Sequence, residues 1–189
     1  MRNAVVVGER LYLRPVEKGD AEDMARGAAL ETETMMEVLR MPHSSIAAEG
    51  WIEKLYKQQP PEDIAFAVCL KEDASRIGDV ILLEIDYVHR TAETASWIDL
   101  AENRGKGFGT EAKMLLFEYA FERLGLHTLV SYVWEPNVRS AAALLKQGYK
   151  PAGRFKFEDF KDGVYRDALL FDILREDWLA AREALKARR

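Results

Sequence analysis

Three closely spaced glycines, Gly105, Gly107 and Gly109, are the feature that most constrains this sequence. They separate an apolar run at 91–100, typical of a strand, from a segment at 110–124 whose apolar residues recur at helical spacing. Glycine lets the backbone approach a ligand without Cβ atoms in the way, so successive N–H groups can point into one concavity. A helix N-terminus behind the loop adds partial positive charge and unpaired donors. The pattern predicts a binding site for an anion such as phosphate or pyrophosphate.

The spacing of the loop distinguishes between phosphate ligands. A nucleotide-hydrolysing loop needs Gly-x4-Gly-Lys-Ser/Thr, whereas Lys106 here follows the first glycine. A dinucleotide-binding loop needs Gly-x-Gly-x-x-Gly, and Thr110 stands at the position of its third glycine. Neither nucleotide hydrolysis nor nicotinamide binding is therefore expected. A tight turn without a ligand would need one or two glycines rather than three.

The rest of the chain alternates short apolar runs with helical segments, and no linker or internal repeat divides it. Strands are predicted at 11–14, 64–70, 77–85, 91–100, 128–133, 149–157 and 165–174. Helices are predicted from Asp20 to about residue 30, at 46–58, 110–124 and 138–147, and from Asp177 onward. We expect one domain, 1–189, of the α/β (α+β) class: a mixed, mostly antiparallel sheet of about six to seven strands with helices on both faces.

Composition argues against several kinds of function. The formal net charge is −5, and nucleic-acid binding usually shows as a basic excess. No window approaches the roughly 20 apolar residues of a membrane span, and the N-terminal apolar run is too brief for a signal peptide. The single cysteine, Cys69, lies in an apolar run, which predicts core packing and no internal disulfide. We expect a soluble, cytoplasmic protein with no nucleic-acid or membrane partner and no metal ion.

The segment Arg104-x-x-Gly107-x-Gly109 resembles the Arg/Gln-x-x-Gly-x-Gly/Ala signature of the GNAT superfamily of N-acetyltransferases. The resemblance extends over nearly the whole chain. Its further matches are 11–15, Glu93, Asn137-x-x-Ser140, Gly148-Tyr149, 162–167 and 174–178. In order and spacing they are similar to the ribosomal-protein N-terminal acetyltransferase (RimJ/RimL-like) branch. The resemblance implies a GNAT fold with a central, splayed pair of parallel strands, here 91–100 and 128–133.

The resemblance also implies acetyl-CoA as the co-substrate. The pyrophosphate of coenzyme A would lie on the backbone amides of Arg104, Gly105, Lys106, Gly107, Phe108, Gly109 and Thr110. The pantetheine arm would lie between the splayed strands, against Trp97, Ile98 and Asp99, with Asn137 on its far side.

Acetyl transfer to an amine needs a proton acceptor, because an alkyl ammonium with a pKa of about 10.4 is rarely neutral at pH 7. Glu93 matches the strand position where several members of the superfamily carry a general base. A carboxylate in a salt bridge within the sheet is the structural alternative, and both stay open. Glu84, Asp86 and His89 are reserve candidates nearby in the sequence. The oxyanion would be stabilised by a backbone N–H near Trp97.

The proton donor for the departing thiolate is less clearly marked. Many relatives place a tyrosine four residues before the glycine of Gly148-Tyr149, and this sequence has Leu144 there. Ser140, which some members of this branch place near the sulfur, is the candidate that is left. It fits equally well as the N-cap of a helix that begins at Ala141.

The expected reaction is direct attack of an amine on acetyl-CoA. The acceptor is open between a protein N-terminus, a polyamine, an amino acid and an amino-antibiotic, and a homodimer is also open. Acceptor choice is expected to depend on the first two helices and on a loop at 157–163 between the last two strands. The alternative function is a catalytically silent CoA-binding sensor or scaffold, which Leu144 motivates.

Overall fold

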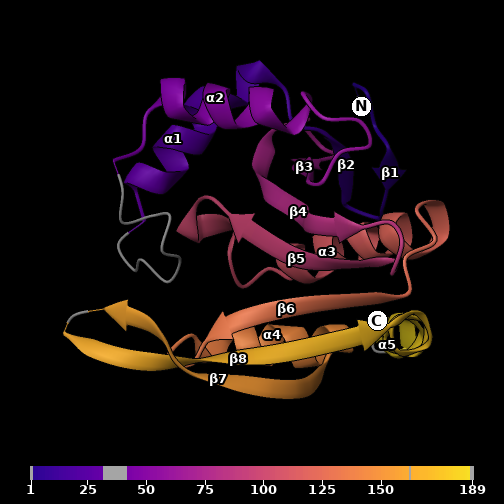
Figure 1. Cartoon of the computed structure of the whole chain (residues 1–189). Helices are drawn as coiled ribbons and strands as arrows, with labels where there is room; N and C mark the ends of the chain where they lie inside the picture. Colours follow the sequence, from indigo (N-terminus) through magenta and orange to yellow (C-terminus); the bar gives the residue numbers. More distant parts are fainter. Residues whose placement is uncertain (1, 32–41, 162, 188–189) are drawn as a thin grey trace.

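The computed structural model of the chain describes residues 2–31, 42–161 and 163–187, and one eight-stranded sheet runs through it (Figure 1). The strands are β1 (Val6–Val7), β2 (Leu11–Pro15), β3 (Ile64–Leu70), β4 (Arg76–Asp86), β5 (Thr91–Ile98), β6 (Thr128–Trp134), β7 (Lys150–Lys161) and β8 (Val164–Leu174). Their order is β1-β2-β3-β4-β5-β6-β8-β7, and each neighbouring pair is antiparallel except β5 and β6. The predicted mixed, mostly antiparallel sheet is confirmed. The additional strand is β1, whose two residues are too few to give a periodic pattern.

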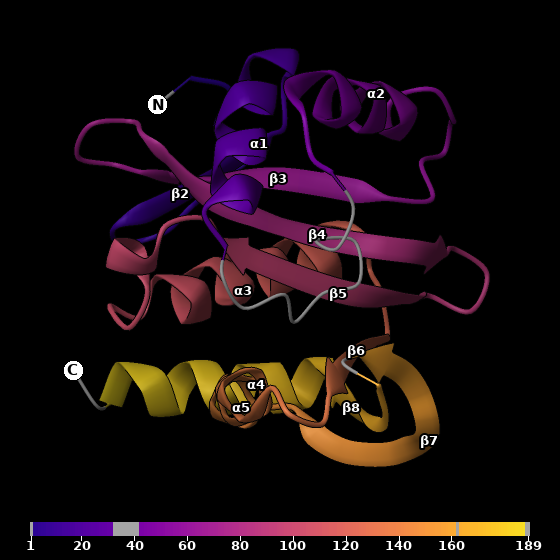
Figure 2. The same cartoon turned by 90° about the vertical axis from the view of Figure 1, so that its left-hand side faces the viewer.

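Helices cover both faces of the sheet, as predicted (Figure 2). The helices are α1 (Ala21–Ala29), α2 (Ser45–Leu55), α3 (Phe108–Glu118), α4 (Val138–Gln147) and α5 (Arg175–Ala187), with short turns η1 (Lys18–Asp20), η3 (Ala101–Asn103) and η4 (Tyr119–Arg123). The first two pack on one face, and α3 to α5 pack on the other. No helix in the described part of the chain is long and apolar enough to cross a membrane.

Two apolar layers hold the helices to the sheet. Leu82, Phe117 and Trp178 belong to the layer on the α3 side, whereas Ile52 and Cys69 belong to the layer under α1 and α2. Alternate residues of a strand point to opposite faces, so the same strands supply both layers. Cys69 is fully buried, which confirms its role in the core, and burial raises the pKa of its thiol.

The last two strands form one long hairpin, so the loop predicted at 157–163 is wrong. The pairing of β7 with β8 continues, across register shifts after Pro151 and after Phe155, to Lys161 opposite Val164. Aromatic residues favour strands, and Phe157 and Tyr165 lie close together on the exposed hairpin, with ring centroids 6.2 Å apart. Gly163, at φ +77°, lies between the two strands, and residue 162 of the predicted loop is outside the described residues.

The parallel pair at the centre of the sheet is short. It comprises Thr91–Thr128, Ala92–Leu129 and Glu93–Val130, after which β5 and β6 diverge (Figure 1). Two side-chain hydroxyls take over where the ladder stops: Thr94 donates to the carbonyl of Val130 (3.2 Å), and Ser131 donates to the carbonyl of Thr94 (3.1 Å). The splayed central pair is therefore present at the predicted strands.

Candidate active site

The loop between β5 and α3 presents a row of backbone amides. Gly105 and Gly107 adopt φ values of +76° and +83°, which favour glycine. Gly107 is the N-cap of α3, so the helix begins at Phe108 and not at residue 110 as predicted. Within the described residues, the amides of 105–110 donate no hydrogen bond; the first bond of the helix runs from Glu111 to the carbonyl of Gly107 (3.1 Å). These donors, together with the positive end of α3, suit an anion.

The amide of Arg104 does not belong to this row. It donates to the carbonyl of Ala101 (3.0 Å), which ends the turn η3. The Arg104 side chain is also committed: Nε and Nη2 donate to the carbonyl of Ile98 (3.0 and 2.9 Å), and Nη2 donates to Glu31 (2.7 Å). Its guanidinium lies 5.2 Å from the ring centroid of Trp97. Arg104 therefore ties the loop to the end of β5 and is not directed at an anion.

Two residues far apart in the sequence hold the loop in place. The carboxylate of Glu111, on the first turn of α3, is buried and accepts hydrogen bonds from the amide of Arg10 (2.8 Å), from Arg10 Nε (2.8 Å) and from the amide of Leu11 (3.1 Å). Arg10 Nη1 in turn donates to the carbonyl of Lys106 (3.0 Å), and the guanidinium stacks 4.7 Å from the centroid of Phe108. The start of β2 is thus fastened to the loop by charge-assisted bonds.

Asp99 is held on the α1 side of the sheet. Its buried carboxylate pairs with Arg76, which also pairs with Asp79. Its amide donates to the carbonyl of Ile77 (3.0 Å), and its carbonyl accepts from Arg104 (3.2 Å). Because side chain and backbone are both engaged, the contacts of Asp99 are structural and do not support the predicted contact with the pantetheine arm.

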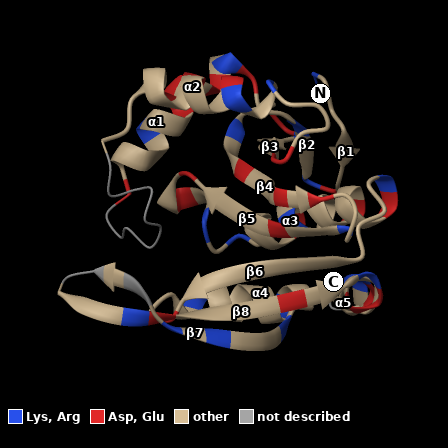
Figure 3. Cartoon of the chain, viewed as in Figure 1, with Lys and Arg blue, Asp and Glu red and all other residues tan. Residues whose placement is uncertain are grey.

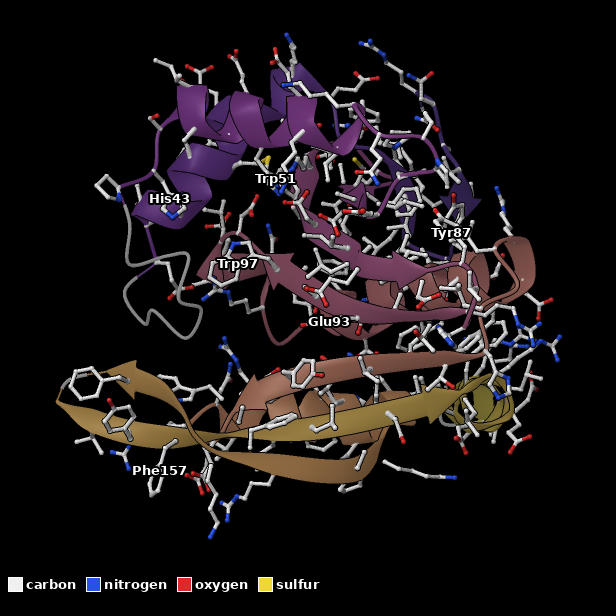
Figure 4. The ribbon with its side chains drawn as sticks, viewed as in Figure 1. His43, Trp51, Tyr87, Glu93, Trp97 and Phe157 are labelled. Carbon is white, nitrogen blue, oxygen red and sulfur yellow. The ribbon has the colours of Figure 1, made fainter. Side chains whose placement is uncertain are left out.

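Glu93 is the last residue of β5 that pairs with β6. Figure 4 shows it on the same strand as Trp97, where β5 and β6 begin to part. Burial raises the pKa of its carboxyl, the carboxylate of Glu84 raises it further, and Lys113 opposes the shift. No ion pair involving Glu93 is found in the described part of the chain, so the salt bridge considered above is not formed. A half-buried carboxyl with a raised pKa is a stronger proton acceptor than a free carboxylate.

The reserve candidates lie around the turn of the β4–β5 hairpin, close to Glu93, which pairs with Leu83. Asp86 accepts from the amides of Val88 and His89 and pairs with the His89 ring (2.8 Å), which stabilises the turn. The bond from the His89 amide, and after it the bond to the ring, lowers the pKa of Asp86, and the bond to the Asp86 carboxylate raises the pKa of His89. Glu84 is exposed on β4, and its amide donates to Asp63 (3.0 Å).

A family model for the acetyltransferase (GNAT) domain matches residues 10–150, which is most of the chain and includes the loop, both splayed strands and α4.

The chain is a GNAT acetyltransferase.

Individual relatives agree with the family. Spermidine N(1)-acetyltransferase of Escherichia coli (strain K12) is 29% identical over 161 residues, covering 80% of this chain and 86% of that protein. A putative ribosomal N-acetyltransferase of Bacillus subtilis, YdaF, is 26% identical over 175 residues, covering 91% and 95%. A structure of spermidine N-acetyltransferase from Vibrio cholerae with CoA and spermine is 27% identical, with a TM-score of 0.77, and covers 91% of this chain and 99% of that chain. The GNAT protein described here transfers the acetyl group of acetyl-CoA to a primary amine.

In this acetyltransferase α4 spans 138–147, as predicted, but Ser140 is not its cap. Asn137 is the N-cap, and its Oδ1 accepts from the amide of Ser140 (3.1 Å). The helix therefore begins at Val138, and Ser140 lies inside its first turn, so a cap by Ser140 on a helix from Ala141 is wrong. Asparagine is a preferred N-cap residue. Leu144 is buried in the apolar layer below.

Sequence reasoning missed a buried lysine. The Lys113 side chain on α3 is 1% exposed, and none of the described residues accepts a hydrogen bond from its Nζ. Nζ lies 5.9 Å from the ring centroid of Tyr149, whose hydroxyl shares a 2.5 Å hydrogen bond with the Thr94 hydroxyl. Burial lowers the pKa of Lys113 to about 7, against the opposing effect of Glu93. The sequence does contain a sign of this buried lysine, because Lys113 interrupts the apolar stripe that Phe117 continues one turn later.

Proposed function

We propose that this acetyltransferase acetylates a polyamine. The argument has two supports. The relatives named above include spermidine N-acetyltransferases from two organisms. In addition, Figure 3 places acidic positions along β4 and β5 beside an uncharged β6, and Glu84 and Glu93 influence each other electrostatically. A second or third ammonium group on the acceptor would be attracted to such carboxylates.

For acetyl-CoA, we propose that the pyrophosphate lies on the amides of Gly105, Lys106, Gly107, Phe108, Gly109 and Thr110, which have no other partner in the described residues. The pantetheine arm would lie between β5 and β6 beyond the Glu93–Val130 pair, along Trp97 and Ile98. Asn137 uses its oxygen as a helix cap, so its amide NH2 is the group that would meet the arm. Arg104 and Asp99 take supporting positions in this arrangement.

Glu93 is the proposed general base. Neutralising an alkyl ammonium at pH 7 costs roughly 4 to 5 kcal/mol, so a nearby proton acceptor accelerates attack. General bases typically contribute about a hundredfold to ten-thousandfold. Backbone N–H groups of β5 beyond Glu93 that face the splay would stabilise the oxyanion, as expected near Trp97. Ser140 stays a candidate contact to the sulfur.

Other acceptors are supported by other observations. A protein N-terminus is favoured by the RimJ/RimL-like resemblance and by the putative ribosomal N-acetyltransferase among the relatives, while an amino acid or amino-antibiotic has no observation of its own. Three other expectations also stay predictions: that residues 1–189 form one domain, that the protein is a homodimer and that it is cytoplasmic.

The test is thiol release from acetyl-CoA against spermidine, spermine, a ribosomal N-terminal peptide, free amino acids and an aminoglycoside. We expect kcat/KM to be highest for a polyamine by at least about tenfold, which is about 1.4 kcal/mol of transition-state binding. A higher value for the peptide would overturn the polyamine proposal. Binding of acetyl-CoA with no turnover on any amine would support the sensor alternative.

Three variants test the roles of the carboxylates. Glu93→Gln keeps the shape but cannot accept a proton, so kcat is expected to fall about a hundredfold or more. Glu84→Gln is expected to raise KM for the polyamine but not for a monoamine of similar length. Glu122→Gln, in the turn η4 that follows α3 and at an exposed ion pair with Arg175, is the matched control. An unchanged kcat in Glu93→Gln would contradict the base assignment.

A further inference from the structure

Lys113 is a buried titratable group that the mechanism above does not use. Among the described lysines it is the one that is buried, and its ammonium has no hydrogen-bond acceptor there. Burying an unpaired cation is costly, and an apolar side chain of the same length would avoid that cost. The position therefore invites a functional explanation.

The surroundings of Lys113 place it next to the point where β5 and β6 part. Tyr149 lies under the lysine Nζ, and the Tyr149 hydroxyl bonds to Thr94, the first β5 residue after the ladder ends. Glu93, which precedes Thr94 on β5, is the charged group that affects the pKa of Lys113. Tyr149 is buried and burial raises the pKa of its hydroxyl, so it stays neutral beside the lysine. Lys113 and Glu93 thus lie on the two sides of one junction.

The reaction needs a proton at this junction. When the carbon–sulfur bond breaks, its electron pair stays on sulfur, and the thiolate must be neutralised or protonated. Leu144 supplies no acidic group from α4. An ammonium that titrates near neutrality can donate a proton and recover it at the same pH.

We propose that Lys113 donates the proton that the departing thiolate takes up. The inference rests on the proposed function, in which the pantetheine arm lies between β5 and β6. The neutral acceptor amine forms the carbon–nitrogen bond and loses a proton to Glu93. The carbon–sulfur bond breaks, an N–H bond of the Lys113 ammonium breaks with its electron pair kept on nitrogen, and an S–H bond forms. Glu93 then releases its proton to solvent, and Lys113 takes one up, which restores both groups.

Kinetics of Lys113→Met provide the first test. We expect kcat to fall about tenfold to a hundredfold, less than for a typical acid because a thiolate leaves readily, while KM for acetyl-CoA changes less than about threefold. The fall of kcat at alkaline pH that reports the protonated lysine is expected to disappear. Adding Leu144→Tyr, which places a phenol on α4, is expected to recover part of kcat. Lys113→Gln serves as a second neutral variant if the methionine variant folds poorly.

A purely structural lysine predicts something different. Its removal would leave kcat and the pH profile unchanged in a folded variant, and that result would overturn the proposal. A loss of kcat in Ser140→Ala, together with full activity in Lys113→Met, would assign the proton to Ser140 instead.

A second measurement needs no acceptor amine. An ammonium beside the sulfur stabilises the thiolate, and the thiolate in turn keeps the lysine protonated, so the thiol of enzyme-bound CoA is expected to titrate about one pH unit lower in the wild type than in Lys113→Met, a tenfold difference in thiolate fraction. Ultraviolet absorbance of the thiolate against pH measures it. Identical titrations would overturn the proposal even if a polyamine is acetylated. A clear difference between the two thiol titrations, without turnover of any amine, would support the role of Lys113 beside the sulfur and contradict the proposed acceptor.

Discussion

The glycine loop and the junction of β5 with β6 are built from different parts of the chain. The loop offers backbone amides, whose positions depend on φ at Gly105 and Gly107. The junction offers side chains from separate elements, Lys113 and Glu93 with the buried Tyr149 beside them. A loop of amides tolerates changes of side chain but not of backbone conformation, whereas a cluster of side chains is lost when a side chain is replaced. The two regions therefore differ in which substitutions disable them.

The largest effect is expected from Gly107→Glu. The substitution places a side chain in the left-handed region and a negative charge on the anion site, and it is expected to weaken acetyl-CoA binding about a thousandfold, or roughly 4 kcal/mol. Isothermal titration calorimetry measures the change. Gly19→Glu adds the same charge at a glycine with open space around it, and is the control. Gly107→Ala isolates the conformational part. Near-normal binding by Gly107→Glu would mean that the anion site lies elsewhere.

Lys113→Met is expected to change how stability depends on pH. The folded-state pKa of about 7 lies below the ordinary lysine pKa of 10.5, so between these values the unfolded chain binds more protons and stability rises with pH. From pH 7 to pH 9 the lysine contributes about 2 kcal/mol of this rise. The variant is expected to be the more stable protein at pH 7 and to lack that part of the slope. Urea unfolding of both proteins at several pH values measures it; parallel curves would contradict the low pKa.

Arg10→Met tests how far the loop depends on side chains. The variant loses the side-chain bonds from Arg10 Nε to Glu111 and from Arg10 Nη1 to the Lys106 carbonyl, and the guanidinium over Phe108, but keeps the bond from the Arg10 amide to Glu111. We expect acetyl-CoA affinity to fall about tenfold, since charge-assisted bonds of this kind contribute roughly 1.5 to 3 kcal/mol and part of that is lost to solvent screening. Lys71→Met removes a neighbouring bond to the Gly8 carbonyl and serves as the control. Equal affinities in both variants would show that the amides hold their positions unaided.

The smallest effect is expected at the start of α4. Asn137→Ala removes the helix cap and is expected to cost about 1 kcal/mol of unfolding free energy. Ser140→Ala leaves the cap in place and is expected to change stability by less than about 0.5 kcal/mol. Urea unfolding without ligand compares them, and a larger loss in Ser140→Ala would restore Ser140 as a structural residue.

Much of the fold could be predicted because strands, helices and the glycine loop are local patterns. The splayed pair and the identity of the ligand came from the resemblance, not from periodicity. The fastening of Glu111 by Arg10 could not be predicted, because 101 residues separate the two and neither stands out in its own segment. The hairpin beyond Phe157 was missed because Gly163 and its neighbours read as a loop, although aromatic residues flank them. Lys113 was passed over as one more helical lysine.

Because the ladder between β5 and β6 has three pairs and then stops, hydrogen exchange of the sheet amides can report whether a ligand is bound. Beyond Glu93 and Val130, alternate amides of each strand face the splay without a partner strand. Such amides exchange their hydrogens with solvent faster than those paired with β4 or β8. A molecule that fills the splay and accepts from them would slow that exchange in 94–98 and 131–134, so deuterium uptake there reports occupancy, residue by residue, without any reaction taking place.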